Sequence, residues 1–101
     1  MTLRYTRVTW RHQNSHDPVR IYSELDDARW EVRRVEVFSD DSLGYASRSR
    51  SRGRTFLSPE TFSSLAEIAA NPEFEAAEIE KDEFDEMWSK ATRADIHPEE
   101  G

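Results

Sequence analysis

The stretch that decides the fold covers residues 30–47 and reads WEVRRVEVFSDDSLGYAS. Residues 30–38 are rich in β-branched and aromatic side chains, which predicts a strand. Residues 39–42 have the composition of a turn, and residues 43–47 then return as the hairpin partner. An antiparallel sheet is therefore the expected framework of the fold.

The apolar alternation in this first strand is broken. Val32 has one parity, whereas Val35 and Val37 have the other, and two arginines stand between them. Either both faces of the strand are partly covered, or a β-bulge shifts the register at the arginines.

Further strands are expected on both sides of the hairpin. Residues 2–10 and 19–25 are rich in β-branched and aromatic or aliphatic residues, and they precede it. Residues 74–79 read either as a fifth strand or as an extended connection, and the strand is the favoured interpretation.

The second half of the chain changes to a helical period. Ser64 and Glu67 have the spacing of a capping box and predict a short helix that ends before Pro72. Asp82 is the expected cap of a final helix. Its core-facing stripe follows the i, i+3, i+4, i+7 pattern, with Phe84, Met87, Trp88 and Ala91.

These elements predict an α+β fold. We expect an antiparallel meander of about four to five strands, with two helices in the C-terminal half packed on one face. Residues 1–93 would form a single α+β domain, and residues 94–101 a flexible tail.

The charge of the chain is unevenly distributed along the sequence. The 101 residues carry a net charge of −7. Residues 1–59 hold 11 basic and 8 acidic residues, a balance of +3, whereas residues 60–101 hold 3 basic and 13 acidic residues, a balance of −10. The two regions form either two separate faces or one self-complementary surface. The overall sign argues against general nucleic-acid binding.

The absence of cysteine excludes disulfides, thiolate zinc sites and a cysteine nucleophile. The N-terminal residues contain no apolar run of the length of a signal peptide or a membrane span. We therefore expect a cytoplasmic protein with no membrane contact.

Several segments resemble one family. They are residues 8–10, residues 22–36 with the sequence YSELDDARWEVRRVE, residues 71–75 with the sequence NPEFE, and residues 83–88 with the sequence EFDEMW. The resemblance is to small bacterial domains of unknown function, frequent in actinobacteria, and it extends to about residue 91. It implies a bacterial cytosolic protein and supplies no activity, ligand or catalytic residue.

Two polar clusters contain residue types that could carry chemistry. His12, His16 and Asp17 are ligand types that zinc or iron uses, but they stand in an expected loop, so no metal and no cofactor are predicted. Asp26 and Asp27, which follow Glu24, are interpreted as turn residues rather than as acid and base.

Arginine and serine alternate in residues 47–54. If this segment were extended, the arginines would lie on one side at a spacing near that of phosphates along a single strand of nucleic acid. A hairpin loop is the favoured alternative. The candidate nucleic-acid-binding residues are Arg48, Arg50, Arg52 and Arg54.

The acidic stretch near the C-terminus is usually a solvated face, but it could also steer a basic protein partner. Its candidate partner-binding residues are Glu80, Asp82, Glu83, Asp85 and Glu86, with Trp30 as an aromatic anchor. The expected function is that of a non-enzymatic interaction protein, immunity-like or regulatory, that binds an unidentified protein. The sequence also leaves open whether the chain forms homo-oligomers.

An enzyme is the least favoured class. The sequence has neither a glycine-rich phosphate loop nor a nucleophile with an adjacent base, so no catalytic residue is predicted.

Overall fold

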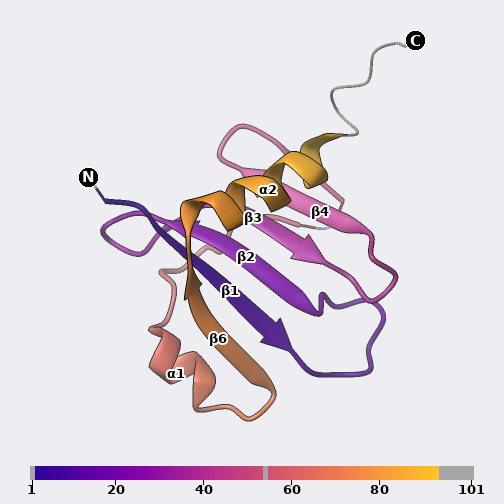
Figure 1. The fold of residues 1–101 in the computed structure, drawn as a ribbon, viewed down its shortest axis with the longest axis horizontal. Helices are drawn as coiled ribbons and strands as arrows, with labels where there is room; N and C mark the ends of the chain where they lie inside the picture. The colour runs from indigo at the N-terminus through magenta and orange to yellow at the C-terminus, as the bar shows by residue number, and fades with distance from the viewer. Residues whose placement is uncertain (1, 54, 94–101) are drawn as a thin grey trace.

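The structure is a computed structural model that describes residues 2–53 and 55–93. Within these residues, six strands form one antiparallel sheet in the order β5-β4-β3-β2-β1-β6 (Figure 1). The strands are β1 (Arg4–Trp10), β2 (Arg20–Leu25), β3 (Glu31–Val37), β4 (Leu43–Ser47), β5 (Ser51–Arg52) and β6 (Phe74–Ile79). The helices are α1 (Leu65–Ala69) and α2 (Lys81–Thr92). The α+β class is confirmed, but the prediction of four to five strands was too low.

The first four strands form the predicted meander, and β6 closes the sheet on its other side. β6 pairs antiparallel with β1, from Tyr5 opposite Ile79 to Trp10 opposite Phe74. The strand interpretation of residues 74–79 is therefore confirmed. The pairing brings the acidic residues of β6 beside the first strand.

A register shift in the β2–β3 pair explains the broken alternation. Arg33 lies opposite Glu24, whereas Glu31 lies opposite Leu25, which leaves Val32 as the extra residue. The irregularity thus precedes the two arginines. Beyond it, residues of one parity face α2 and residues of the other parity face residues 55–64 and α1.

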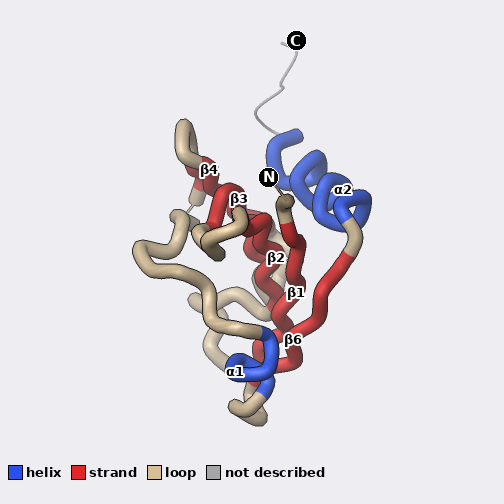
Figure 2. Tube along the Cα trace, turned by 90° about the vertical axis from the view of Figure 1, so that its left-hand side faces the viewer, coloured by secondary structure: helices blue, strands red, loops and turns tan. Residues whose placement is uncertain are grey.

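The two helices lie on opposite faces of the sheet (Figure 2). α2 covers the face that contains the main core, which includes Tyr5, Tyr22, Val35, Tyr45 and Phe84. α1 lies on the other face, where Ile68 lines a cavity with Val8, Ile21 and Phe74. The prediction that both helices pack on one face was wrong. After β5, the chain crosses the second face through residues 55–64 and reaches β6 from there.

The helix starts follow the predictions in part. Ser64 Oγ accepts a hydrogen bond from the Glu67 N–H at 3.2 Å, and Glu67 Oε1 accepts from the Ser64 N–H at 3.1 Å, so the capping box is confirmed. The cap of α2 is Glu80 rather than Asp82. The N–H of Phe84 donates to the carbonyl oxygen of Glu80, which places Asp82 in the first turn.

The expected apolar stripe of α2 faces the sheet, with Phe84 and Ala91 buried and Met87 and Trp88 packed against the core. Neither of the described helices is long and apolar enough to cross a membrane. The predicted tail, residues 94–101, lies outside the described residues.

Candidate functional site

A chain of charged groups joins α2 to the sheet. Arg33 donates to both carboxylate oxygens of Glu24, at 2.7 and 2.8 Å, and to Asp85 at 3.3 Å. Lys81 donates to the other oxygen of Asp85 at 2.5 Å. The Arg33 guanidinium also lies 4.9 Å from the ring centroids of both Phe84 and Trp88. One arginine therefore links two strands and the helix that covers them.

These contacts shift the pKa values of the groups involved. Burial alone would raise the pKa of Glu24, but hydrogen bonds from Arg33 and Tyr5, together with the charge of Arg33, lower it overall. Burial, followed by the hydrogen bond to Glu24 and its charge, raises the pKa of Tyr5 to about 12. The Tyr5 hydroxyl therefore holds its proton at neutral pH.

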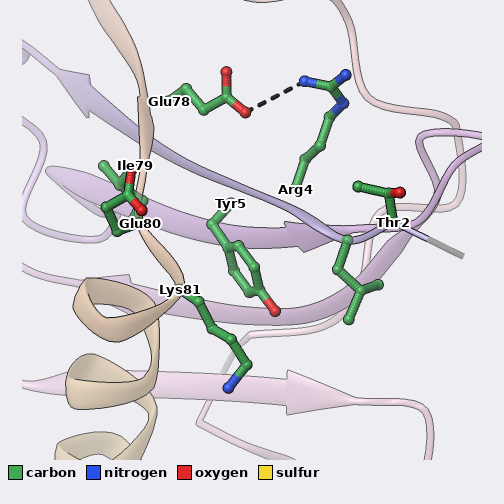
Figure 3. Close-up of a pocket in the computed structure, with 8 residues that line it drawn as sticks. Thr2, Arg4, Tyr5, Glu78, Ile79, Glu80 and Lys81 are labelled. Atoms are coloured by element: carbon green, nitrogen blue, oxygen red, sulfur yellow. Dashed lines mark hydrogen bonds and ion pairs between the residues drawn. The ribbon is translucent and has the colours of Figure 1, made fainter.

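A cavity of about 780 Å³ opens at the end of the sheet where β1 begins and α2 starts (Figure 3). Arg4 and Glu78 form an ion pair of 3.3 Å on one side of the strands, whereas Tyr5 and Lys81 point to the other side (Figure 3). The remaining lining residues are Thr2, Leu3, Ile79 and Glu80. Since Tyr5 is protonated and Lys81 is paired with Asp85, we find no activated nucleophile among these residues.

The predicted partner-binding carboxylates differ in their surroundings. Glu83 is paired with Arg7, Asp85 with Arg33 and Lys81, and Glu86 with Lys90 at 3.5 Å. Such exposed pairs reduce the net charge that a partner meets.

The two acidic residues at the start of α2 are different. Glu80 and Asp82 are exposed, and neither forms an ion pair with any residue that the structure describes. Trp30, the predicted anchor, lies in the turn between β2 and β3 with 43% of its surface exposed.

The charge asymmetry of the sequence is largely compensated in space. Besides the pair of Arg4 with Glu78, Arg7 bonds to Glu83 and Arg11 bonds to Glu75. The pairs of Arg4 with Glu78 and of Arg11 with Glu75 follow from the β1–β6 pairing, which brings these residues side by side, whereas Glu83 reaches Arg7 from α2. Of the two arrangements left open by the sequence, these contacts fit the self-complementary surface.

The arginine-rich segment is a hairpin. The Ser47 N–H donates to the Arg50 carbonyl oxygen at 2.7 Å, so the chain reverses between β4 and β5. Arg48 pairs with Asp26 at 3.6 Å, and Arg50 lies 5.6 Å from the Tyr45 ring centroid. Residues 48–52 therefore do not form one extended row. Arg54 is outside the described residues, and Arg52 lies in β5.

The other two polar clusters have structural roles. His12 contacts the Pro18 carbonyl oxygen at 2.8 Å and accepts from the Asn14 N–H. Asp26 Oδ1 accepts from the N–H groups of Ala28 and Trp30, as expected of a turn residue. No group of three metal-ligand side chains occurs in residues 2–53 and 55–93.

Residues 4–93 match the family described as "Domain of unknown function (DUF6881)". The chain belongs to this family. No curated protein and no solved structure matches it significantly. The resemblance to a family of unknown function is confirmed, and membership assigns this DUF6881 domain no activity.

A buried charged cluster on the second face was missed by sequence reasoning. Arg34 bonds to Glu31 at 3.1 Å and to Glu36 at 3.0 Å. Thr55 donates to Glu36 at 2.7 Å, and the Ser58 N–H donates to Glu31 at 2.8 Å. The Glu31 side chain is fully buried and that of Arg34 is 18% exposed. The alternation of Arg34 and Glu36 in a strand with covered faces was the available signal, but the covering segment could not be foreseen.

Proposed function

We propose that this domain is a non-enzymatic bacterial cytosolic interaction protein that binds a basic protein partner, as an immunity protein or a regulator would. The contact surface is the acidic start of α2, formed by Glu80 and Asp82 and flanked by Glu83 and Glu86. The observation that carries the proposal is the lack of ion pairs at Glu80 and Asp82 within the described chain, although neighbouring carboxylates have cations of their own.

Uncompensated exposed carboxylates attract a cationic surface over the distance of the Debye length. Lys81 stands between Glu80 and Asp82 in sequence, but its ammonium is bound to Asp85. The partner would therefore meet net negative charge at this end of the molecule.

The position of Trp30 supports the same surface. The β2–β3 turn lies at the end of the sheet where β6 leads into α2 (Figure 1). An exposed tryptophan at the same end of the sheet as an acidic patch is suited to be an aromatic anchor within a polar rim. Asp85 is assigned a structural role instead, because it holds Arg33 and Lys81.

The nucleic-acid alternative, through Arg48, Arg50, Arg52 and Arg54, receives less support. Arg48 is already paired with Asp26, and the hairpin does not align the arginines in one row. A mobility-shift assay with short DNA and RNA at low salt addresses this alternative, since phosphate contacts are strongest there.

Comparative affinity capture tests the main proposal. The wild-type domain, E80K/D82K and the control E60K are used as baits in a lysate of the source organism. Glu60 is exposed in the segment before α1, away from α2, so its reversal controls for a charge reversal elsewhere on the surface. We expect a partner that E60K retains and E80K/D82K loses. A partner retained equally by all three baits would contradict the assigned surface.

A further inference from the structure

The face of the sheet opposite α2 contains a cleft beneath α1 and residues 58–63, here called the loop-side cleft. It consists of two adjoining cavities of about 380 and 360 Å³, which share Arg34, Phe62, Ser63 and Ile68. The larger cavity is within the size range of small-molecule sites, about 300–1,000 Å³. The cleft is separate from the surface proposed above, which lies on α2.

The lining of the larger cavity of the loop-side cleft is mainly apolar. The sheet supplies Val8, Ile21 and Phe74, and the covering segment supplies Phe62 and Ile68. Apolar side chains on both walls favour a ligand with an aliphatic or aromatic body. Thr6, two residues before Val8 on the same face, is 3% exposed, and its Oγ1 has no hydrogen-bond partner among the described residues. A buried polar atom therefore remains unsatisfied on this face of the sheet, at a residue that does not itself line the cleft.

The charged groups around the cleft determine whether it favours a cationic or an anionic ligand. Arg34 reaches the cleft, but two carboxylates, Glu31 and Glu36, already bind its guanidinium. Arg29, from the adjoining turn, donates to the carbonyl oxygens of Phe62 and Ser63. Two more carboxylates, Glu60 and Glu67, line the cavities. These residues give four carboxylates against two guanidiniums, an excess of negative charge.

Glu67 is the carboxylate best placed to bind a ligand. Its Oε1 accepts hydrogen bonds from the backbone N–H and the hydroxyl of Ser64, whereas its Oε2 receives none from the described residues. An ammonium at Oε2 would lie beside the apolar lining that Phe62 and Phe74 form, where aromatic rings add favourable contacts to a cation.

We propose that the loop-side cleft binds a small amine with an apolar or aromatic body. The apolar body lies against Val8, Ile21 and Phe74, and the ammonium group contacts Glu67. A carboxylate of the same shape is rejected, because it would face the excess negative charge and would find Arg34 already paired.

Three probes with the same phenylethyl body test which charge the site prefers: cationic 2-phenylethylamine, neutral 2-phenylethanol and anionic 3-phenylpropionate. Each is titrated into the 15N-labelled domain while amide shifts are followed by NMR. We expect the amine to bind most tightly and to shift the amides around Ile68 and Phe74. Equal or tighter binding of the carboxylate would overturn the proposal, as would a failure of the amine to shift these amides.

Two variants test the position of the site. E67Q retains the capping box, since glutamine is also found at this position, and should weaken amine binding about two- to fivefold. The matched control E86Q, on the opposite face, should leave it unchanged. S63W places a large ring at an exposed position of the lining and should abolish binding. Full amine affinity in a folded S63W protein would show that the cleft is not the site.

Discussion

Arg33 donates hydrogen bonds to both carboxylate oxygens of Glu24 across the β2–β3 pair, at 2.7 and 2.8 Å. The Glu24 side chain is only 4% exposed, so the pair lies within the structure rather than on its surface. The same guanidinium stacks on two aromatic rings of α2. Because Arg33 also pairs with Asp85, its side chain links the final helix to a buried carboxylate of the sheet.

Removing Arg33 should destabilise the fold more than removing an exposed arginine. R33M leaves a buried carboxylate without its cation, which costs about 3–5 kcal/mol. R7M breaks a half-exposed pair with Glu83 and should cost below about 1 kcal/mol. Urea denaturation measures both free energies of unfolding. Equal losses in the two variants would contradict the assignment of Arg33 as the link.

The lowered pKa of Glu24 predicts a loss of stability in acid. Because the folded-state pKa lies below the ordinary value of 4.5, the contribution of Glu24 is complete above pH 4.5 and is lost as the pH falls through the folded-state pKa. Asp85 also has a lowered pKa and adds to the effect. Urea midpoints measured from neutral pH downward should fall less steeply for E24Q than for wild type. Parallel curves would count against a paired Glu24.

The raised pKa of Tyr5 predicts a second loss of stability, at alkaline pH. Between its ordinary pKa of 10 and the folded-state value of about 12, the folded protein keeps a proton that the unfolded chain releases. The unfolded state therefore binds fewer protons, and stability falls as the pH rises through this window. Urea midpoints above pH 9 should decline less for Y5F, since phenylalanine has no proton to lose. An unchanged decline would place the titrating group elsewhere.

The space around Gly44 shows how closely the segment after β5 packs on the sheet. A Cβ atom at this position would stand 2.2 Å from Thr55 Oγ1, which donates to Glu36. G44A should therefore displace Thr55 and cost about 1–3 kcal/mol. A double-mutant cycle with T55A measures the coupling, because removing Oγ1 relieves the clash. Additive losses would contradict the close contact of Gly44 and Thr55.

Local pattern predicted most of the elements, although not β5 or the cap of α2, and it did not predict their assembly. The capping box at Ser64, the strand at residues 74–79 and the apolar stripe of α2 were all predicted, since each depends on neighbours in sequence. The pair of Arg4 with Glu78 depends on which strand lies beside β1, and no local period contains that information.

The candidate site, too, could be predicted only as far as it depends on residues that are close in sequence. The acidic residues of α2 were recognised as a group, but the partners of Glu83 and Asp85 come from β1 and β3, so the sequence could not show which carboxylates stay unpaired. The cluster around Arg34 was missed because its burial depends on residues 55–63, a segment without regular structure. The pairing of the α2 carboxylates and the burial of Arg34 both depend on which distant segments pack together, and not on residue type alone.

The central claim is that the start of α2 steers a basic partner, and the association rate constant tests it most directly. Once a partner is captured, its binding to wild type, E80K/D82K and E60K is followed by stopped flow at several salt concentrations. We expect E80K/D82K to associate about tenfold more slowly at low salt, with a difference that shrinks as the salt concentration rises, and E60K to stay close to wild type. Equal association rates for wild type and E80K/D82K at low salt would contradict the claim.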